Sequence, residues 1–179
     1  MDSGGQLDSR RKRLIADIHA AFADVRLDDG ISLYAARALD HHAPPSQLAE
    51  ANRRHHPEMQ WPWLQDNEIE WFSDTLPFMD PKGIRFYLPR FMVWSLANAH
   101  ASNSDAADNL IYLLDIGDLF PEDHLERYFA LLTCEQRRVV AAFLAFIVDS
   151  AGEALDDTFD DVAAKRALDR YWHKYLNPP

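Results

Sequence analysis

The sequence predicts an all-α protein, a single irregular bundle of about eight or nine helices. Two observations lead to this prediction. Apolar side chains recur at spacings of three and four residues along most of the chain, the period of a helix with one buried face. No stretch of useful length shows the two-residue alternation of a half-buried strand. Capping residues, prolines and glycines separate the periodic stretches, as expected between helices.

Length and composition favour one domain over residues 1–179, with residues 1–6 as a loose tail. At 179 residues, 47% of them apolar, the chain can bury roughly 70% of the surface that its unfolded form exposes. The single cysteine, Cys134, excludes an internal disulfide. These features predict a cytoplasmic protein that folds without covalent cross-links.

The first half of the chain predicts four helices. Leu14, Ile18 and Phe22 lie on one face of the first. Gly30 follows it in a turn, where we expect a positive φ. Ser46 is the expected N-cap of a short third helix, which ends before Pro57. The predicted ranges are 14–25, 31–42, 46–54 and 66–76.

The second half contains the two helices that we expect at the centre of the bundle. Asp80 followed by Pro81 marks a helix start, and residues 84–97 are apolar on most faces, which predicts a buried helix kinked at Pro89. Thr133 and Gln136 form a capping box at the start of a second buried helix, residues 134–149. Further helices are predicted at 104–114, at 121–132 and after the acidic loop 152–160.

Several stretches resemble an uncharacterised family of small bacterial helical proteins, a domain of unknown function. The residues that carry the resemblance are LDDGISLYAARALD (27–40), FSDTLPFMDPKGIRFYLPRFM (72–92), FALLTCEQRRVVAAFLAF (129–146) and AAKRALDRYW (163–172). The DPKGIRFYLPRF segment is the most specific, because proline inside an aromatic helix is unusual. The resemblance covers about residues 22–173. It implies a helical fold and a bacterial cytosolic setting, and it implies no activity, cofactor or catalytic residue.

The net charge of −11 is concentrated in one part of the chain. Residues 105–161 contain 14 acidic and 3 basic side chains. Such a field repels nucleic acid and anionic membranes and attracts a basic protein. The longest apolar run, residues 139–148, is too short to span a bilayer. We therefore expect a basic protein as partner, no nucleic acid, no membrane, and a monomer or homodimer.

The acidic face at 105–161 is the predicted binding surface, and four of its aspartates are the main candidates. Its acids outnumber Arg127, Arg137 and Arg138, the only basic residues in the same segment, so we expect most of them to face water or a partner. Neutralising the candidates together should slow association and leave the melting temperature nearly unchanged. The candidates are Asp156, Asp157, Asp160 and Asp161.

Four histidines flank the short third helix in two adjacent pairs and are weak candidates for a metal site. Imidazole binds zinc, copper or nickel, and Asp40 or Glu58 can add a carboxylate. Neither pair shows a recognised metal-binding spacing, and adjacent histidines on a helix point about 100° apart. We expect solvated helix-end histidines, and no bound metal or cofactor. The four are His41, His42, His55 and His56.

The stretch RRHHPEMQWPWL, residues 53–64, ends in Trp61 and Trp63, each next to Pro62. Two interpretations are open. The tryptophans either form an exposed contact for a partner protein, where tryptophan is enriched, or fold inward and anchor the loop to the core. We favour the anchored corner and keep both residues as partner-binding candidates.

The leading functional interpretation is a non-enzymatic protein-binding module. An immunity-like or antitoxin-like inhibitor is one concrete form, because toxins that attack nucleic acid are basic. The alternative is a small hydrolase or metal-binding enzyme that uses the histidines or a pocket near Arg85 and Tyr87, beside the predicted kink. For that pocket we favour the simpler interpretation, in which Arg85 pairs with an acid of a neighbouring helix and Tyr87 belongs to the core.

Overall fold

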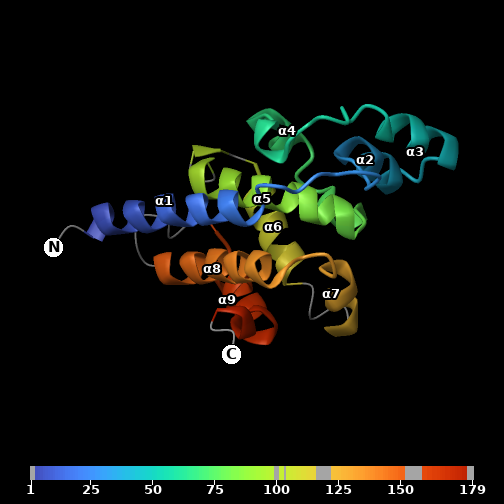
Figure 1. Ribbon diagram of the computed structural model, residues 1–179. Helices are drawn as coiled ribbons and strands as arrows, with labels where there is room; N and C mark the ends of the chain where they lie inside the picture. Colours follow the sequence, from blue (N-terminus) through green and yellow to red (C-terminus); the bar gives the residue numbers. More distant parts are fainter. Residues whose placement is uncertain (1–2, 99–100, 103, 116–121, 152–158, 177–179) are drawn as a thin grey trace.

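A computed structural model describes residues 3–98, 101–102, 104–115, 122–151 and 159–176. The all-α prediction is confirmed, since 71% of the described residues are helical. The described part contains nine α-helices and three 3₁₀ turns (Figure 1). The α-helices are α1 (Ser3–Ala21), α2 (Leu33–Asp40), α3 (Pro45–Asn52), α4 (Asp66–Trp71), α5 (Pro81–Asn98), α6 (Ala106–Leu114), α7 (Glu122–Tyr128), α8 (Cys134–Ser150) and α9 (Asp161–Arg170); the 3₁₀ turns are η1 (Trp61–Trp63), η2 (Leu76–Phe78) and η5 (Trp172–Tyr175).

The two helices predicted at the centre, α5 and α8, are buried over most of their length. Helix α1 packs along α8 and also contacts α5, whereas α9 packs on α8 from the opposite side (Figure 1). Pro89 lies inside the continuous helix α5. The predicted capping box of α8 is present, with the Thr133 hydroxyl accepting from the Gln136 amide at 3.1 Å.

Some predicted helix boundaries are wrong. Helix α1 begins at Ser3, so residues 3–6 are helical and are not a loose tail. Helix α3 begins at Pro45 with Pro44 as its N-cap, and Ser46 lies inside the helix. Proline fixes the φ angle that the first helical turn needs, which explains why this helix starts without a capping side chain.

Gly30 and Gly83 allow the loop after α1 to approach the first turn of α5. Gly30 does not adopt the positive φ that we predicted; the positive angle, 53°, belongs to Asp28. A Cβ added at Gly30 would lie 2.7 Å from the Lys82 Cβ, and one added at Gly83 would lie 2.6 Å from the Ile31 carbonyl oxygen. The Asp80 carboxylate fixes this junction, because it accepts from the amides of Gly83 at 2.8 Å and Ile31 at 3.0 Å.

We expect Gly83→Ala to destabilise the protein, although alanine is the better helix former by ~1 kcal/mol. The new methyl group would meet a backbone oxygen, which cannot rotate away, and overpacking of this kind costs ~1–3 kcal/mol. Urea denaturation measures the change. Gly5→Ala, in an exposed part of α1, is the control and should be neutral or slightly stabilising; equal effects of the two substitutions would refute the close-approach argument.

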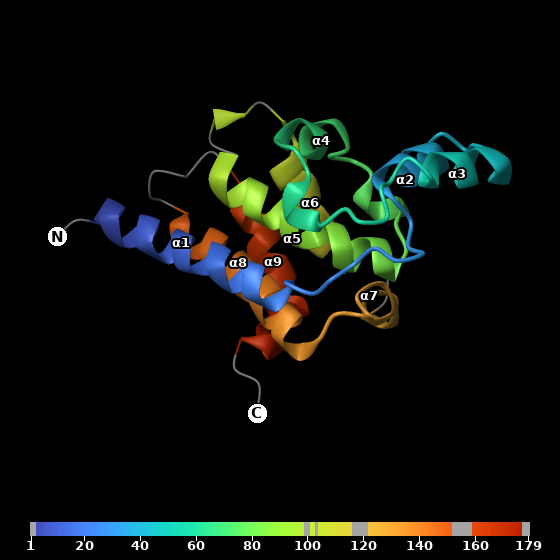
Figure 2. The ribbon, with the colours of Figure 1, turned by 45° about the horizontal axis from the view of Figure 1, so that its top comes forward.

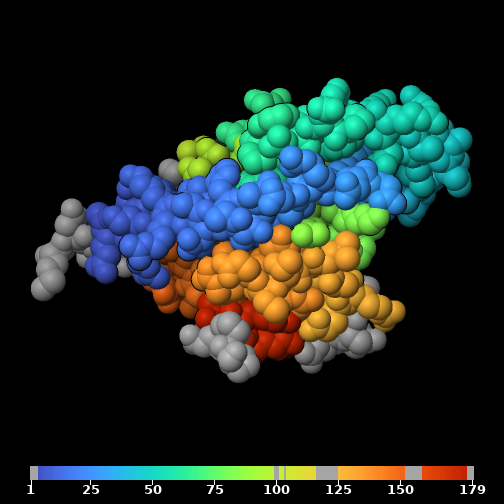
Figure 3. Space-filling view, viewed as in Figure 1, coloured from blue at the N-terminus to red at the C-terminus, as the bar shows by residue number. Residues whose placement is uncertain are grey.

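Helices α2 and α3 form a hairpin that projects from one end of the molecule (Figures 2 and 3). Helix α3 packs against α2 and contains no buried residue. The hairpin is joined to the body by Asn52, whose amide group bridges the backbone amide of Ser32, at 2.7 Å, and the carbonyl of Gly30, at 3.2 Å.

None of the helices that the structure describes is long and apolar enough to cross a membrane.

Candidate functional site

The four histidines do not converge. His41 is exposed, with its Nε2 3.8 Å from an Asp40 carboxylate oxygen, and His42 has a positive φ of 54°. His56 is exposed at the other end of α3, where its Nδ1 accepts from the Glu58 amide. No group of three or more metal-ligating side chains occurs among the residues that the structure describes. His41, His42 and His56 are thus exposed imidazoles without a common metal site among the described residues.

His55 differs from the other three, because it is half-buried and lies against α5. Its Nδ1 is 3.1 Å from the Tyr87 hydroxyl, and its ring meets Phe86 edge-on. Burial lowers the pKa of His55 and raises the pKa of Tyr87. A neutral imidazole and a protonated phenol therefore pair at neutral pH. Sequence patterns placed these two residues in separate candidate sites, and the structure joins them.

The His55 environment predicts a loss of stability on acidification. The pKa of His55 is lowered from its ordinary 6.5 by burial and by nearby His56, with Glu68 opposing. The unfolded chain then binds a proton more readily than the folded one, so the stability is complete above pH 6.5 and falls as the pH drops towards the folded pKa. Urea denaturation of wild type and His55→Asn at pH 7.5 and 5.5 measures this; the variant should show a smaller difference between the two.

His56→Asn is the matched control for that experiment, because His56 is adjacent and exposed. We expect it to keep the wild-type dependence of stability on pH. If His55→Asn and His56→Asn both behave like wild type, burial of His55 does not control stability in this range.

Arg85 forms part of a structural junction between three helices. Its Nε donates to the Gln136 side-chain oxygen at 3.2 Å, and the Gln136 amide group donates to the Ala21 carbonyl at 3.0 Å. Arg85 is thus bound to a neutral amide, and the acidic partner that we favoured from the sequence is wrong. Tyr87 is 1% exposed and belongs to the core, as expected.

The two tryptophans of the WPW turn have opposite environments. Trp61 is 1% exposed, and its indole nitrogen donates to the Phe22 carbonyl at 2.9 Å. A side chain buried in this way cannot contact a partner, so Trp61 as a partner-binding residue is corrected to a core anchor. Trp63 is 55% exposed and remains a candidate. Trp71, which we did not select from the sequence, is 73% exposed. Its spacing from Ile69 and Phe72, which are both buried, is the sequence pattern that could have identified it.

Two acids of the 105–161 segment, Asp115 and Glu126, have basic partners from later in the chain. The Nε and one terminal nitrogen of Arg166 donate to the same carboxylate oxygen of Asp115. The Asp115 side chain is 4% exposed. Glu126 pairs with Arg137 at 3.0 Å and with Lys174 at 3.3 Å. From the sequence we expected most acids to face water or a partner, because we compared them only with the bases of the same segment. Arg166 and Lys174 lie outside that segment.

Three described acids of this segment, Asp105, Asp108 and Asp160, lie where α6 meets α9, whereas Glu135 and Asp149 on α8 pair with Arg138 and Arg10. The Asp160 side chain caps α9 by accepting from the Ala163 amide at 2.8 Å, and its second oxygen accepts from the Tyr112 hydroxyl at 3.1 Å. Asp108 accepts from the Asp160 amide at 3.2 Å. Asp105 is exposed at the N-cap of α6. We call Asp105, Asp108, Tyr112 and Asp160 the α6–α9 patch.

The carboxylates of this patch lie close enough to repel one another. The pKa of Asp108 is raised, mainly by burial and further by the charges of Asp160 and Asp105. Tyr112 is 49% exposed beside them. Asp161 follows in the first turn of α9. Asp156 and Asp157 lie outside the described residues. The patch offers an exposed aromatic ring and carboxylates that a cation would stabilise.

The capping role of Asp160 changes the effect on stability that we expect from neutralising the four aspartates. Because its carboxylate caps α9, loss of that side chain costs ~1 kcal/mol of stability. The expectation that all four aspartates can be neutralised without effect on the melting temperature therefore holds only for substitutions, such as Asp160→Asn, that retain a capping oxygen.

Comparison with known proteins identifies a family and no individual relative. No curated protein and no solved structure matches the chain. Residues 10–176 match the model of a family of unknown function, DUF6714. The resemblance to an uncharacterised helical family is thereby confirmed, and the chain belongs to DUF6714.

Proposed function

We propose that the protein is a non-enzymatic binding module of the cytoplasm that presents its acidic face, residues 105–161, to a basic protein. An immunity-like or antitoxin-like inhibitor is the specific form that we favour. The observation that carries the proposal is the α6–α9 patch, in which three carboxylates repel one another around an exposed tyrosine.

A cationic side chain of a partner would stabilise this patch in two ways. It would relieve the repulsion that, after burial, raises the pKa of Asp108. Its charge would also interact with the face of the Tyr112 ring, which contributes ~0.5–1 kcal/mol at an exposed site. Arginine suits both contacts, because its planar guanidinium pairs with carboxylates and stacks on aromatic rings. The net charge of −11 would add steering at long range.

The test begins with affinity capture from the native host and continues with binding kinetics of the purified pair. We expect the on-rate to fall steeply with added salt, because steering is screened beyond ~10 Å at 0.1 M. Asp105→Asn combined with Asp161→Asn should slow association further. Both aspartates have no side-chain partner in the part of the chain that the structure describes, so the folded state should tolerate the change.

Asp24→Asn combined with Glu58→Gln is the matched control. It removes the same charge from two exposed acids outside the face and should leave the on-rate nearly unchanged. A partner whose association ignores salt, or responds equally to both double variants, would contradict binding through the acidic face.

A further inference from the structure

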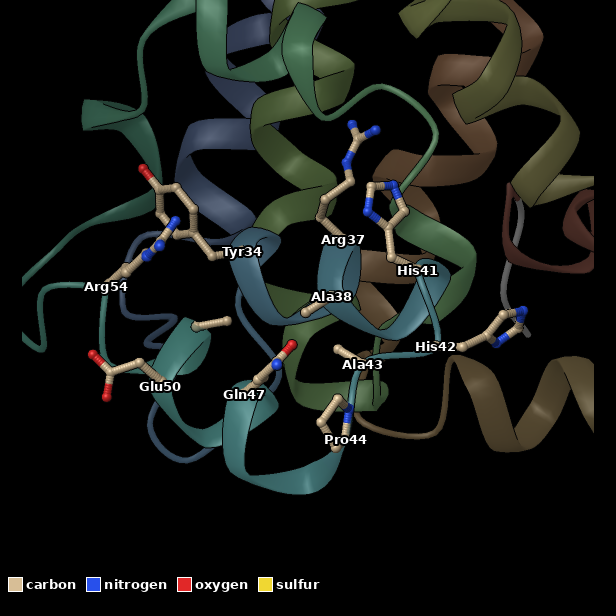
Figure 4. A pocket seen from close by; sticks show the side chains of 11 residues that line it. Tyr34, Arg37, Ala38, His41, His42, Ala43, Pro44, Gln47, Glu50 and Arg54 are labelled. Atoms are coloured by element: carbon tan, nitrogen blue, oxygen red, sulfur yellow. The ribbon is translucent and has the colours of Figure 1, made fainter.

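A groove of about 560 Å³ lies between α2 and α3, at the projecting end of the molecule (Figure 4). Small-molecule sites typically enclose ~300–1,000 Å³. Apolar groups of Ala38, Ala43, Pro44 and Ala51 contribute to its lining. The groove therefore has the size and part of the apolar surface that a small organic ligand needs.

Arg54 supplies a positive charge to this groove, and the nearby Glu68 carboxylate accepts from the Tyr34 hydroxyl at 3.5 Å and forms no ion pair with Arg54. The side chain is exposed and lies with its guanidinium 5.9 Å from the centre of the Tyr34 ring, with no carboxylate partner among the described residues. Figure 4 shows the two side chains together at one side of the groove. A guanidinium held over an aromatic ring loses less freedom when it binds an anion, and it can bind a carboxylate or phosphate with two parallel hydrogen bonds.

The other charged residues that line the groove do not neutralise the charge of Arg54. Glu50 pairs with Arg53, a neighbour that lines a different groove. Arg37 pairs with Asp74 at 2.8 Å, and its buried Nε has no hydrogen-bond partner. His41 stands beside Arg37, one helical turn further along α2 (Figure 4). The groove is thus basic in a chain whose net charge is −11.

We propose that the α2–α3 groove binds a small organic anion, a carboxylate or phosphate carried on a flat apolar body. Arg54 binds the anionic group, the Tyr34 ring and the alanine methyl groups pack against the body, and the imidazoles of His41 and His42 lie at the far end. Helix α3 contributes no buried side chain to the core, so its side chains remain available to the groove. This site is separate from the α6–α9 patch and does not depend on the proposed function.

Titrations with four small probes test the site by amide chemical shifts in ¹H–¹⁵N spectra of the intact chain. Benzoate and phenyl phosphate carry both the anion and the flat body, benzyl alcohol carries the body alone, and acetate carries the anion alone. We expect saturable shifts of residues 34–54 with a dissociation constant of about 1 mM or tighter for at least one of the first two, and binding at least about tenfold weaker for the last two. Whichever of benzoate and phenyl phosphate binds more tightly shows whether the site prefers a carboxylate or a phosphate.

Arg54→Ala should weaken that binding at least about tenfold, and Arg53→Ala is its matched control. The control removes the same charge one residue away, from a side chain that is bound to Glu50 outside this groove. Because Arg54 is exposed, both variants should keep the wild-type spectrum elsewhere. If Arg54→Ala does not keep that spectrum, Arg54→Gln provides a second test. Shifts outside residues 34–54, equal binding of benzyl alcohol and benzoate, or equal losses in the two arginine variants would overturn the proposal.

Discussion

Trp61→Ala should lower the free energy of unfolding by ~3–5 kcal/mol, the usual cost of replacing a large buried aromatic side chain by alanine. The indole is 1% exposed, and its ring centroid lies 4.8 Å from that of the tilted His19 ring of α1. Its removal leaves a cavity between the WPW turn and α1, and it also removes one of the two donors to the Phe22 carbonyl. Thermal denaturation should show a shift of about 2–4 °C for each kcal/mol lost.

Two further variants separate the causes of that loss. Trp61→Phe retains an aromatic ring but not the indole donor. It should therefore cost less than alanine and still lose the ~0.5–1.5 kcal/mol of one hydrogen bond, since the Phe22 carbonyl keeps the Val25 amide as a donor at 3.1 Å. Trp63→Ala truncates the exposed tryptophan of the same turn and should change stability by no more than ~0.5 kcal/mol. Equal effects at the two positions would mean that the turn does not anchor the loop through Trp61.

The opposite environments of Trp61 and Trp63 show why sequence alone reached only part of the site. The two residues have the same type and the same proline neighbour, so local pattern does not distinguish them. What distinguishes them is the Phe22 carbonyl, 39 positions away in the chain. Helices, caps and the two central elements depend on neighbouring residues, and for that reason the sequence predicted them; contacts between distant segments carry no comparable signal.

The acidic segment illustrates the same limit for electrostatics. Counting charges in 105–161 identified a region with few local bases, but Asp115 finds its cation 51 positions later, in Arg166. The contact between His55 and Tyr87, across 32 positions, is a further example. Composition predicts only the average charge of a surface, whereas the packing of α6, α8 and α9 decides which carboxylates find a basic partner.

Arg137 is the one buried arginine among the described residues, and it holds the end of α7 to α8 and η5. It donates to the carbonyls of Phe129, at 2.9 Å, and Leu132, at 3.3 Å. It also donates to the hydroxyls of Tyr171 and Tyr175, at 2.6 and 2.7 Å, and to Glu126. One guanidinium therefore satisfies polar groups from three segments that meet beneath the C-terminal turn.

Arg137→Met should cost about 3 kcal/mol or more, although methionine fills much of the same space. The Phe129 carbonyl keeps the Leu132 amide as a donor at 3.0 Å and loses one hydrogen bond, at ~0.5–1.5 kcal/mol. The Leu132 carbonyl loses its side-chain donor in a buried region, at ~1–3 kcal/mol for a group left unsatisfied. The contribution of Glu126 is smaller, because its side chain is 44% exposed and water can replace the arginine. The penalty thus comes mainly from the carbonyls and tyrosine hydroxyls, which retain their positions after the guanidinium is gone.

Arg138→Met is the matched control, one residue further along the same helix. Arg138 pairs with Glu135 at 2.6 Å on the surface, and exposed pairs of this kind contribute only ~0.3–0.5 kcal/mol. Urea denaturation should therefore separate two adjacent arginines by more than about 2 kcal/mol, since only the first lies where water cannot take over its hydrogen bonds. Similar small losses for both would show that Arg137 is solvated in solution, and the junction of α7, α8 and η5 would then have to be stabilised by the packing of Phe129 and Trp172 alone.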